Sequence, residues 1–390
     1  MATVPPFAPW ARASKAANRV KAIKLLLLST PVAPLGSGLG GGVELTVANL
    51  ARVLVQFGHQ LTIVTPEGAQ LGSLGLLTLP IEIIQVSGTL QTAAQSTSRA
   101  TGRNAPVTVS EVLASAWTYA RCNQARYDLI VNFAYDWLPF YLTPFMTVPV
   151  AHFVSMGSLS DRMDAVIAQV SHQFPGTLAA YTQAQAGTFC TEVPIDWKIL
   201  GCGLDLRQYE YCPNPDNHVA WVGRLSPEKG LEDTIAAASR AHQSLKIYGA
   251  IEDEAYWRAL QPAIEKATAQ VEYCGFLSTA LLQRSLGKAK ALLVTPHWVE
   301  AFGIVAIEAL ACGVPVLAYR QGGPAEIVRS GKTGWLVRPG NIAELTIALR
   351  KLNRLNRQDC RLQAEKLYSL NAWGRRCERW FYQLTGALEN

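Results

Sequence analysis

Residues 298–313 read WVEAFGIVAIEALACG and place two glutamates, Glu300 and Glu308, in an otherwise apolar segment. Helical periodicity leaves little room for a polar face here, because most residues after Gly303 are alanine, valine, leucine or isoleucine. Both carboxylates facing solvent is one interpretation. Otherwise each carboxylate needs a partner, because an unpaired carboxylate in an apolar setting is strongly unfavourable. The segment itself supplies no such partner.

Short apolar runs alternate with helical patterns on both sides of this segment, which is typical of βαβ units and parallel sheets. A chain of 390 residues with 49% hydrophobic and 16% charged residues is large enough for two such domains. The Pro, Asn and Asp residues at 213–217 indicate the boundary between them. We expect strands at residues 23–28, 60–66, 81–86, 128–133, 148–154, 187–193, 218–223, 244–249, 270–275, 290–296 and 315–320.

Composition limits the class of function. The net charge is +6, but the positive excess lies in residues 1–24 and 350–390, so the segment between them is slightly acidic. Clustered bases with interleaved aromatic residues, the pattern of nucleic-acid binding, are not visible. The longest early apolar run, residues 22–35, contains a lysine and two prolines and is too short for a membrane span. The eight cysteines show no C-x-x-C pair and no zinc spacing, which is typical of reduced thiols in a cytoplasmic protein.

A glycine-rich loop follows the first expected strand. Gly36, Gly38 and Gly41 satisfy G-x-G-x-x-G, and Glu67 ends the next strand, so a NAD-binding oxidoreductase is a rival interpretation. In that fold the first glycine directly follows its strand, whereas about seven residues separate Leu28 from Gly36 here. Glycines at the start of a helix also let backbone N–H groups approach any anion. A merely flexible loop is the third possibility.

Two cations follow the first strand of the second half, in the loop GRLSPEKG at residues 223–230. Arg224 offers a planar fork and Lys229 a point charge, and together they can neutralise a diphosphate. The chain contains no D-x-D pair of aspartates to clamp a metal ion on such a diphosphate. We therefore expect no metal site. Ordinary surface cations are the alternative interpretation.

A last segment completes the pattern. Residues 322–341, GGPAEIVRSGKTGWLVRPGN, combine paired glycines, an acid and a second turn. Together with GGVE at 41–44, the GRLSPEKG loop and the E-x7-E pair, they resemble the retaining, nucleotide-sugar-dependent glycosyltransferases of family four. The resemblance runs from about Lys24 onward. Those enzymes have the GT-B fold, in which two Rossmann-like α/β domains face each other across a cleft.

The resemblance implies four parts of the chain. Residues 1–22 would be a flexible extension, and 23–200 an acceptor-binding Rossmann-like domain. Residues 201–370 would bind the nucleotide-sugar, and 371–390 would form a helix that packs back on the N-terminal domain.

The resemblance also implies a donor site. Glu308 would accept hydrogen bonds from the ribose hydroxyls and Glu300 would lie beside the transferred sugar, so the ligand would supply the missing partners. Arg224 and Lys229 would hold the pyrophosphate. The implied donor-binding residues are Gly41, Gly42, Arg224, Lys229, Glu300, Phe302, Gly303, Ile304 and Glu308. The implied catalytic residues are His152, Glu300, Arg224 and Lys229.

A narrower resemblance points to the acceptor. STPVAPLGSGLGGGVELT and GHQLTIVTPEG are similar to UDP-glucose:tetrahydrobiopterin glucosyltransferases of cyanobacterial type. This implies a reduced pterin acceptor whose side-chain hydroxyl attacks the sugar. The expected acceptor-binding residues are Tyr135, Asp136, Trp137 and His152. The alternatives are that these aromatic residues pack the domain and that the histidine is structural.

The sequence as a whole predicts a metal-independent, retaining transferase that moves a hexose to a small hydroxylated acceptor. The expected donor is UDP-glucose, with no other cofactor. A transferase acting on a sugar or lipid acceptor, a phosphorylase, a NAD-binding oxidoreductase and a non-catalytic binding protein are the rivals. A phosphorylase would need a lysine for pyridoxal phosphate, and no lysine can be assigned to that role.

Overall fold

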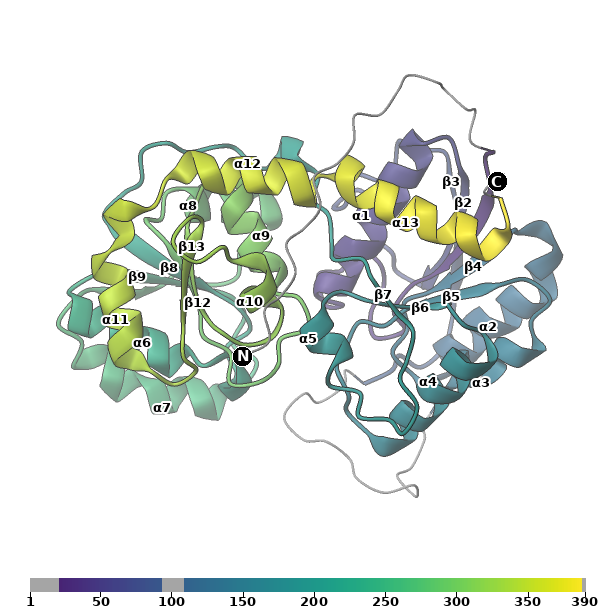
Figure 1. Ribbon diagram of the computed structural model, residues 1–390, viewed down its shortest axis with the longest axis horizontal. Coiled ribbons are helices and arrows are strands. Elements are labelled where there is room, and N and C mark those ends of the chain that lie inside the picture. The colour runs from purple at the N-terminus through teal and green to yellow at the C-terminus, as the bar shows by residue number, and fades with distance from the viewer. Residues whose placement is uncertain (1–20, 93–108, 388–390) are drawn as a thin grey trace.

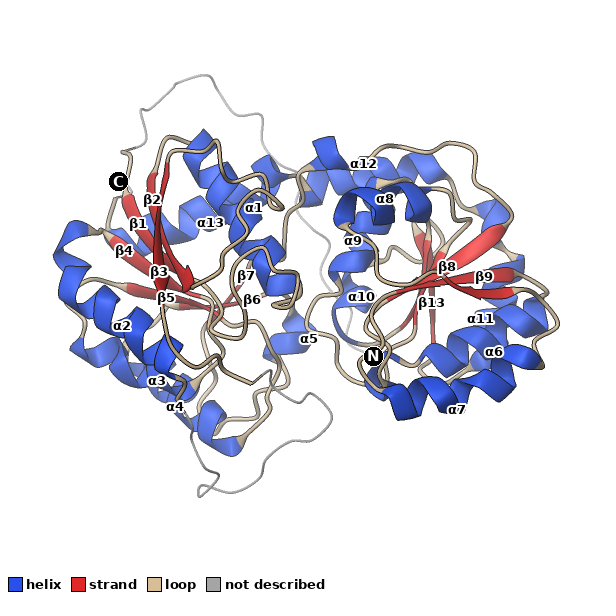
Figure 2. Cartoon of the chain, turned by 180° about the vertical axis from the view of Figure 1, so that it is seen from behind, coloured by secondary structure: helices blue, strands red, loops and turns tan. Residues whose placement is uncertain are grey.

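The computed structural model describes residues 21–92 and 109–387, which form two α/β domains side by side (Figure 1). The extension expected at residues 1–22 falls almost entirely outside the described residues. Figure 2 shows the same two domains from behind, each with a central sheet between layers of helices.

The N-terminal domain is built on a seven-stranded sheet with the order β3-β2-β1-β4-β5-β6-β7. All neighbouring strands run parallel. The strands are β1 (Lys24–Leu28), β2 (Gln60–Pro66), β3 (Ile81–Val86), β4 (Leu129–Asn132), β5 (Val150–Phe153), β6 (Leu178–Ala180) and β7 (Trp197–Ile199). The helices are α1 (Gly42–Gln56), α2 (Glu111–Asn123), α3 (Trp137–Leu142), α4 (Asp161–Gln173) and α5 (Gln183–Ala186).

The leucine run of β1 explains the layered arrangement. Leu25 and Leu27 pack into one core cluster, with residues of α1 and of the C-terminal helix α13 (Leu370–Thr385). Leu26 and Leu28 pack into a second cluster, with residues of α2. Alternate residues of a strand point to opposite faces, so an unbroken apolar strand requires helices on both sides of the sheet.

The C-terminal domain repeats this design with a six-stranded parallel sheet in the order β10-β9-β8-β11-β12-β13. Its strands are β8 (His218–Val222), β9 (Ser244–Tyr248), β10 (Val271–Tyr273), β11 (Leu292–Val294), β12 (Val316–Tyr319) and β13 (Gly334–Val337). Its helices are α6 (Leu231–Ala241), α7 (Glu254–Glu265), α8 (Thr279–Gly287), α9 (Ile304–Ala311), α10 (Gly322–Ile327), α11 (Ile342–Arg350) and α12 (Arg357–Tyr368).

The expected strands are confirmed except at residues 187–193, where the prediction is wrong. Gly187 and Thr188 form the turn that ends α5, and no strand follows until β7. Sequence analysis also missed β6, β7 and β13. Strands of three or four residues are too short to display a clear alternation of apolar and polar residues.

Two crossings connect the domains, and they run side by side. The backbone N–H of Leu204, in the first crossing, donates to Tyr368 O at 2.7 Å, and the N–H of Leu370 donates to Leu204 O at 3.0 Å. Helix α13 then packs against α1 of the N-terminal domain. The contact is close, because a Cβ atom at Gly374 would lie 2.5 Å from a methyl carbon of Val53.

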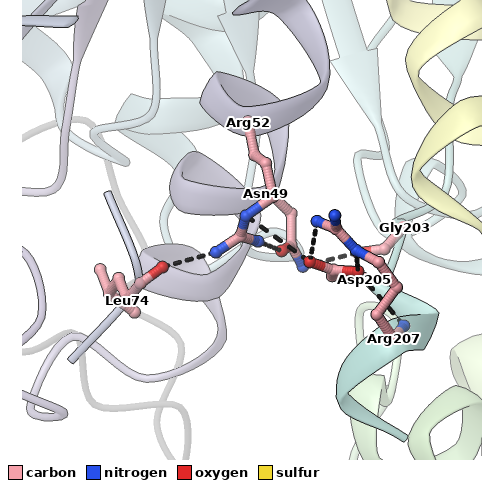
Figure 3. A network of polar contacts seen from close by, with 6 residues as sticks. All are labelled: Asn49, Arg52, Leu74, Gly203, Asp205 and Arg207. Carbon is pink, nitrogen blue, oxygen red and sulfur yellow. Dashed lines mark hydrogen bonds and ion pairs between the residues drawn. The ribbon is translucent and has the colours of Figure 1, made fainter. Parts of the chain in front are cut away.

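A buried polar network fixes α1 to the first crossing (Figure 3). Asn49 donates to Gly203 O at 2.8 Å and accepts from Arg52 at 2.8 Å. Arg52 Nε lies 3.7 Å from the Asp205 carboxylate, which Arg207 also binds through two hydrogen bonds of 2.8 and 2.7 Å. Burial alone would raise the pKa of Asp205, but the hydrogen bonds and charge of Arg207 outweigh it and lower that pKa. The network sets the direction in which the chain leaves the N-terminal domain.

Candidate active site

Glu300 lies in the loop between β11 and α9 and has two partners from its own domain. Its Oε2 accepts from Lys229 Nζ at 2.6 Å and from Trp298 Nε1 at 3.2 Å. The Lys229 ammonium also lies 5.0 Å from the centre of the Trp298 ring, within range of a cation–π contact. Lys229 and Glu300 are each about one-fifth exposed, so this ion pair is accessible to a ligand.

Glu308 lies on α9 itself, further along the chain than Glu300. Its Oε1 accepts from the hydroxyl of Tyr209 at 2.8 Å. Burial raises the pKa of Glu308, and the hydrogen bond from Tyr209 opposes that rise. The expectation that only a ligand supplies partners to Glu300 and Glu308 is therefore wrong, and so is the expectation that residues 298–313 supply none, because Trp298 belongs to that segment. Sequence analysis missed Tyr209 because it lies 99 positions away along the chain.

Arg224 and Lys229 occupy the loop after β8, as the sequence predicted. Arg224 is paired with the carboxylate of Glu252 and lies 3.2 Å from Glu228 Oε1. The loop closes on the end of β11 at Gly230, where a Cβ atom would lie 2.0 Å from Thr295 O. Gly230 has φ +62°, so glycine is required for both space and conformation. Both cations thus stand at the carboxyl end of the sheet, where open α/β folds bind ligands.

The GGPAE segment packs against the backbone of the Glu300 loop. Gly323 N–H donates to Glu300 O at 2.7 Å, and a Cβ atom at Gly322 would lie 2.6 Å from the same oxygen. The acid of this segment, Glu326 on α10, reaches across to the other domain. It accepts from the N–H groups of Gln183 and Ala184, at the start of α5, at 3.1 and 2.6 Å.

The glycine-rich loop of the N-terminal domain faces this assembly. A Cβ atom at Gly42 would lie 2.8 Å from the Ile304 side chain, so the first turns of α1 and α9 meet across the domain boundary. Gly41, with φ +62°, is the N-cap of α1. Gly303, with φ +83°, is the N-cap of α9. Phe302 is only 5% exposed and packs against the rings of Tyr181 and Tyr368, an interior role that differs from direct donor contact.

Sequence analysis missed the function of Glu44, the acid of GGVE. Its carboxylate accepts from the N–H groups of Gly36 at 2.7 Å, Gly38 at 3.2 Å and Gly40, and from the Ser37 hydroxyl at 3.3 Å. Two glycines of the G-x-G-x-x-G pattern therefore hold a carboxylate of this chain. This geometry counts against the dinucleotide interpretation, which needs those N–H groups for a pyrophosphate.

The roles expected for His152 are not supported. The residue is fully buried in β5, where its ring stacks on Phe140. Nε2 lies 2.8 Å from Thr143 Oγ1, and Nδ1 lies 3.2 Å from the amide nitrogen of Asn132. Burial lowers the pKa of His152 to about 3, so the ring is neutral. The structure makes it a core histidine with both ring nitrogens occupied.

The other expected acceptor contacts are also used within the N-terminal domain. Asp136 caps α3 by accepting from Leu138 N–H at 2.9 Å and is 7% exposed. Tyr135 donates its hydroxyl to Gly157 O at 3.0 Å. Trp137 stacks on Tyr141 with ring centres 4.4 Å apart. The packing alternative therefore describes these residues better than a pterin-binding wall.

Two negative findings apply to residues 21–92 and 109–387. No three His, Cys, Asp or Glu side chains in these ranges come together as a metal ion would require. No helix among them is long and apolar enough to cross a bilayer. A cavity of about 350 Å³ lies between α1 and α8, and it borders Gln208 and Glu210 on either side of Tyr209.

Comparison with known proteins finds similarity mainly in the C-terminal half of the chain. Residues 206–367 match the family Glycosyl transferases group 1. The glycogen synthase of Mycobacterium tuberculosis is 34% identical over 163 residues, or 40% of this chain and 39% of that protein. The mannosyltransferase alg-2 of Neurospora crassa is 31% identical over 188 residues, or 44% of this chain and 40% of that protein. These matches span about two-fifths of the curated relatives.

Solved structures match over nearly the whole chain. Anabaena Alr3699/HepE in complex with UDP and glucose has a TM-score of 0.71 at 19% identity, covering 93% of this chain and all of that one. Sucrose-phosphate synthase from Thermosynechococcus elongatus has a TM-score of 0.71 at 18% identity, covering 94% and 100%. The fold is therefore GT-B, and residues 206–367 within it match the family Glycosyl transferases group 1.

Proposed function

We propose that this protein transfers a hexose from a nucleoside diphosphate sugar to a small hydroxylated acceptor. The observation that carries the proposal is the ion pair of Lys229 and Glu300 beside the start of α9, opposite Gly42 of the other domain, with Arg224 on the same loop as Lys229. Two cations and two helix N-termini at one place form a site suited to a diphosphate. A carboxylate next to them is suited to sugar hydroxyls.

UDP-glucose is the donor we propose. Three similar structures of Anabaena Alr3699/HepE hold UDP, UDP-glucose, or UDP with glucose, which supports this choice by analogy. The relative described as a glycogen synthase agrees with a glucosyl donor. Glu308 would accept from the ribose hydroxyls, with Tyr209 holding its carboxylate in place.

Donor binding would exchange the partners of both cations. Lys229 leaves Glu300 and Arg224 leaves Glu252, and each then donates to the diphosphate oxygens. Glu300, kept in position by Trp298, becomes free to accept from the sugar. As the bond between the anomeric carbon and the diphosphate oxygen breaks, the two cations stabilise the negative charge that develops on the leaving group. The acceptor oxygen forms the new bond on the same face, which retains the anomeric configuration, and its hydroxyl proton passes to the departing diphosphate oxygen.

The absence of a D-x-D pair and the presence of two cations support a metal-independent reaction. The acceptor would approach from the N-terminal domain. No contact in the structure supports a pterin acceptor, because the side chains expected to bind it take part in internal hydrogen bonds and packing. We therefore propose the acceptor only as a small molecule with a free hydroxyl group.

The test is a transfer assay with purified protein, UDP-glucose and a metabolite extract, followed by mass spectrometry. We expect UDP release and one or more acceptors that gain a hexose, in the presence of EDTA. UDP should bind, and NADH should not. Turnover that stops on chelation would overturn the metal-free scheme, and NADH binding without UDP binding would overturn the transferase itself.

A further inference from the structure

Glu44 occupies an anion-binding concavity that the glycine-rich loop would otherwise offer to a ligand. One carboxylate oxygen accepts from the N–H groups of Gly36 and Gly38, and the other from Gly40 and from the Ser37 hydroxyl. Successive backbone N–H groups that point inward bind anions, and such bonds to a charged acceptor are stronger than neutral ones. The Glu44 side chain is only 3% exposed, so the site is closed to solvent.

The loop is built around this carboxylate. A Cβ atom at Gly40 would lie 2.7 Å from Glu44 Cγ, and one at Gly36 would lie 2.3 Å from Gln70 O. Gly36 also has φ +89°, a conformation that glycine adopts without strain. The loop residues at 36 and 40 must therefore be small for Glu44 to reach the N–H groups. The three glycines Gly36, Gly38 and Gly40 thus enclose a carboxylate of the protein itself.

The position of the loop gives this arrangement a consequence for catalysis. Gly41 and Gly42 follow directly, and Gly42 approaches Ile304 at the start of α9. Gly303, the residue before Ile304, lies beside Glu300, because its Cβ atom would be 3.7 Å from Glu300 Cγ. Glu44 therefore fixes a loop of the N-terminal domain that meets the start of α9, next to Glu300.

We propose that Glu44 is a positioning residue for the transfer reaction, acting as a built-in anion that holds the glycine-rich loop in its donor-binding conformation. The inference rests on the proposed function. The N–H groups of Gly36, Gly38 and Gly40 stay on Glu44, and the donor diphosphate meets only the first N–H groups of α1 at Gly41 and Gly42. Without the carboxylate, these three N–H groups lose their acceptor and the loop shifts away from α9.

Glu44→Ala is the decisive variant, because it empties a site shaped for a carboxylate. We expect kcat/KM for UDP-glucose to fall roughly ten- to hundredfold, the scale of a small misplacement of a catalytic group. Sodium formate should restore much of that loss, since its carboxylate can bind the vacated N–H groups. Sodium chloride at equal ionic strength should not. A general loss of stability would not be repaired selectively by formate.

Glu111→Ala is the matched control. Glu111 also begins a helix of the N-terminal domain and accepts a backbone N–H, that of Thr89 at 2.9 Å, but it lies on α2. The Glu111→Ala variant should have unchanged donor KM and kcat, and formate should have no effect on its activity. Gly40→Ala is the second probe, because it displaces the carboxylate while keeping its charge. We expect the same loss of kcat/KM, without rescue by formate.

Each outcome either supports or overturns the positioning role of Glu44. Activity of Glu44→Ala within twofold of wild type, or a folded Glu44→Ala that formate does not restore, overturns the positioning role. If Glu44→Ala does not fold, Gly40→Ala decides, and wild-type activity of that variant overturns the inference. A wild-type protein that neither binds UDP nor consumes UDP-glucose would overturn the proposed function and this inference together, whereas the other failures leave the proposed function standing.

Discussion

At the scale of single residues, the two glutamates of α9 and its preceding loop differ in their surroundings. Glu300 is held by Lys229 and Trp298 in a partly exposed ion pair. Glu308 is held by one neutral hydroxyl, that of Tyr209. The first arrangement can open to exchange a cation, whereas the second presents a fixed acceptor. We expect the two residues to affect different steps.

Glu308→Gln should weaken the binding of UDP itself, because the ribose hydroxyls lose a charged acceptor. The expected loss is about 1.5 to 3 kcal/mol. Glu300→Gln should leave UDP affinity nearly unchanged and lower kcat for sugar transfer. Titration calorimetry with UDP separates the two variants. Equal UDP affinities of both variants and the wild type would refute the assignment of Glu308 to the ribose.

Substitutions of Arg224 and of its partner Glu252 should have opposite effects on the use of the donor. Arg224→Ala should cost about 2 to 4 kcal/mol of transition-state stabilisation, measured as kcat/KM for the donor. Glu252→Gln removes the carboxylate that competes for Arg224, so the donor KM should stay the same or fall. Because both side chains are nearly half exposed, the change from Glu252→Gln should be small. A raised donor KM in Glu252→Gln would contradict the exchange of partners.

The buried His152 should affect the stability of the protein rather than its catalytic rate. The pKa of His152 is lowered from 6.5 to about 3, so the unfolded chain binds a proton that the folded protein does not. Its contribution to stability is therefore complete above pH 6.5 and is lost as the pH falls toward 3, by about 1.4 kcal/mol per pH unit.

His152→Phe keeps a ring against Phe140 and removes this titration. The stability difference between wild type and variant should shrink from pH 7 to pH 5 in denaturant titrations. Exchange of the exposed His172 for Asn is the control. The stability difference between wild type and His172→Asn should stay constant over the same pH range. At pH 7 the folded His152→Phe variant should retain kcat within about tenfold of wild type, the low end of general acid–base effects. A larger loss of kcat would restore a catalytic role for His152.

At the scale of elements, α10 connects the Glu300 loop to the N-terminal domain. Its first glycines support Glu300, and its acid Glu326 binds the first N–H groups of α5. The neighbouring Thr182 donates to Ala301 O at 2.8 Å, so the same corner of α5 also contacts the residue after Glu300. These contacts join the domains next to the proposed sugar site.

Glu326→Gln should loosen this junction, because a carboxylate at the start of a helix loses its charge. We expect UDP to draw the two domains together, seen as compaction in solution scattering, and we expect Glu326→Gln to lower kcat with little change in UDP affinity and to show a smaller compaction. Glu344→Gln is the matched control, since Glu344 also binds a backbone N–H, that of Arg338, but within the C-terminal domain. A Glu326→Gln variant that compacts and turns over like wild type would show that the contact does not govern closure.

The elements also show what the sequence could predict. The unbroken leucines of β1 demand burial on both faces, and long apolar runs of this kind predicted most strands. The order of motifs after strand ends predicted the place of Arg224, Lys229 and Glu300. The direction of a side chain was not predictable. His152 was expected to follow a strand end in the same way, but it lies within β5, where helices cover both faces of the sheet. The fold-back of Glu44 onto its own loop gives no periodic signal at all.

At the scale of the whole molecule, the N-terminal domain includes a helix from the far end of the chain. Trp373, Trp380 and Phe381 of α13 are at most 1% exposed and belong to the same core cluster as β1. Trp380 also donates to Gly176 O at 2.7 Å. The stability of this domain therefore depends on residues that follow the complete C-terminal domain.

Trp380→Ala should destabilise the N-terminal domain alone, by about 3 to 5 kcal/mol. Two-domain proteins can unfold in separate steps, so calorimetry should show one transition shifted downward and one in place. Trp221→Ala, in the core of the C-terminal domain, should shift the other transition. If Trp380→Ala and Trp221→Ala shift the same transition, the two domains unfold as one unit.

The position of α13 has a consequence during translation. Strands β1 to β7 leave the ribosome before the C-terminal domain, but the face of their sheet that α13 covers stays open until that whole domain has followed. The nascent N-terminal domain thus presents unsatisfied apolar surface for the time needed to synthesise more than 150 further residues. Exposed apolar surface on a nascent chain favours aggregation and chaperone binding. Helix α13, made after the whole C-terminal domain, thus completes a domain whose synthesis began before it.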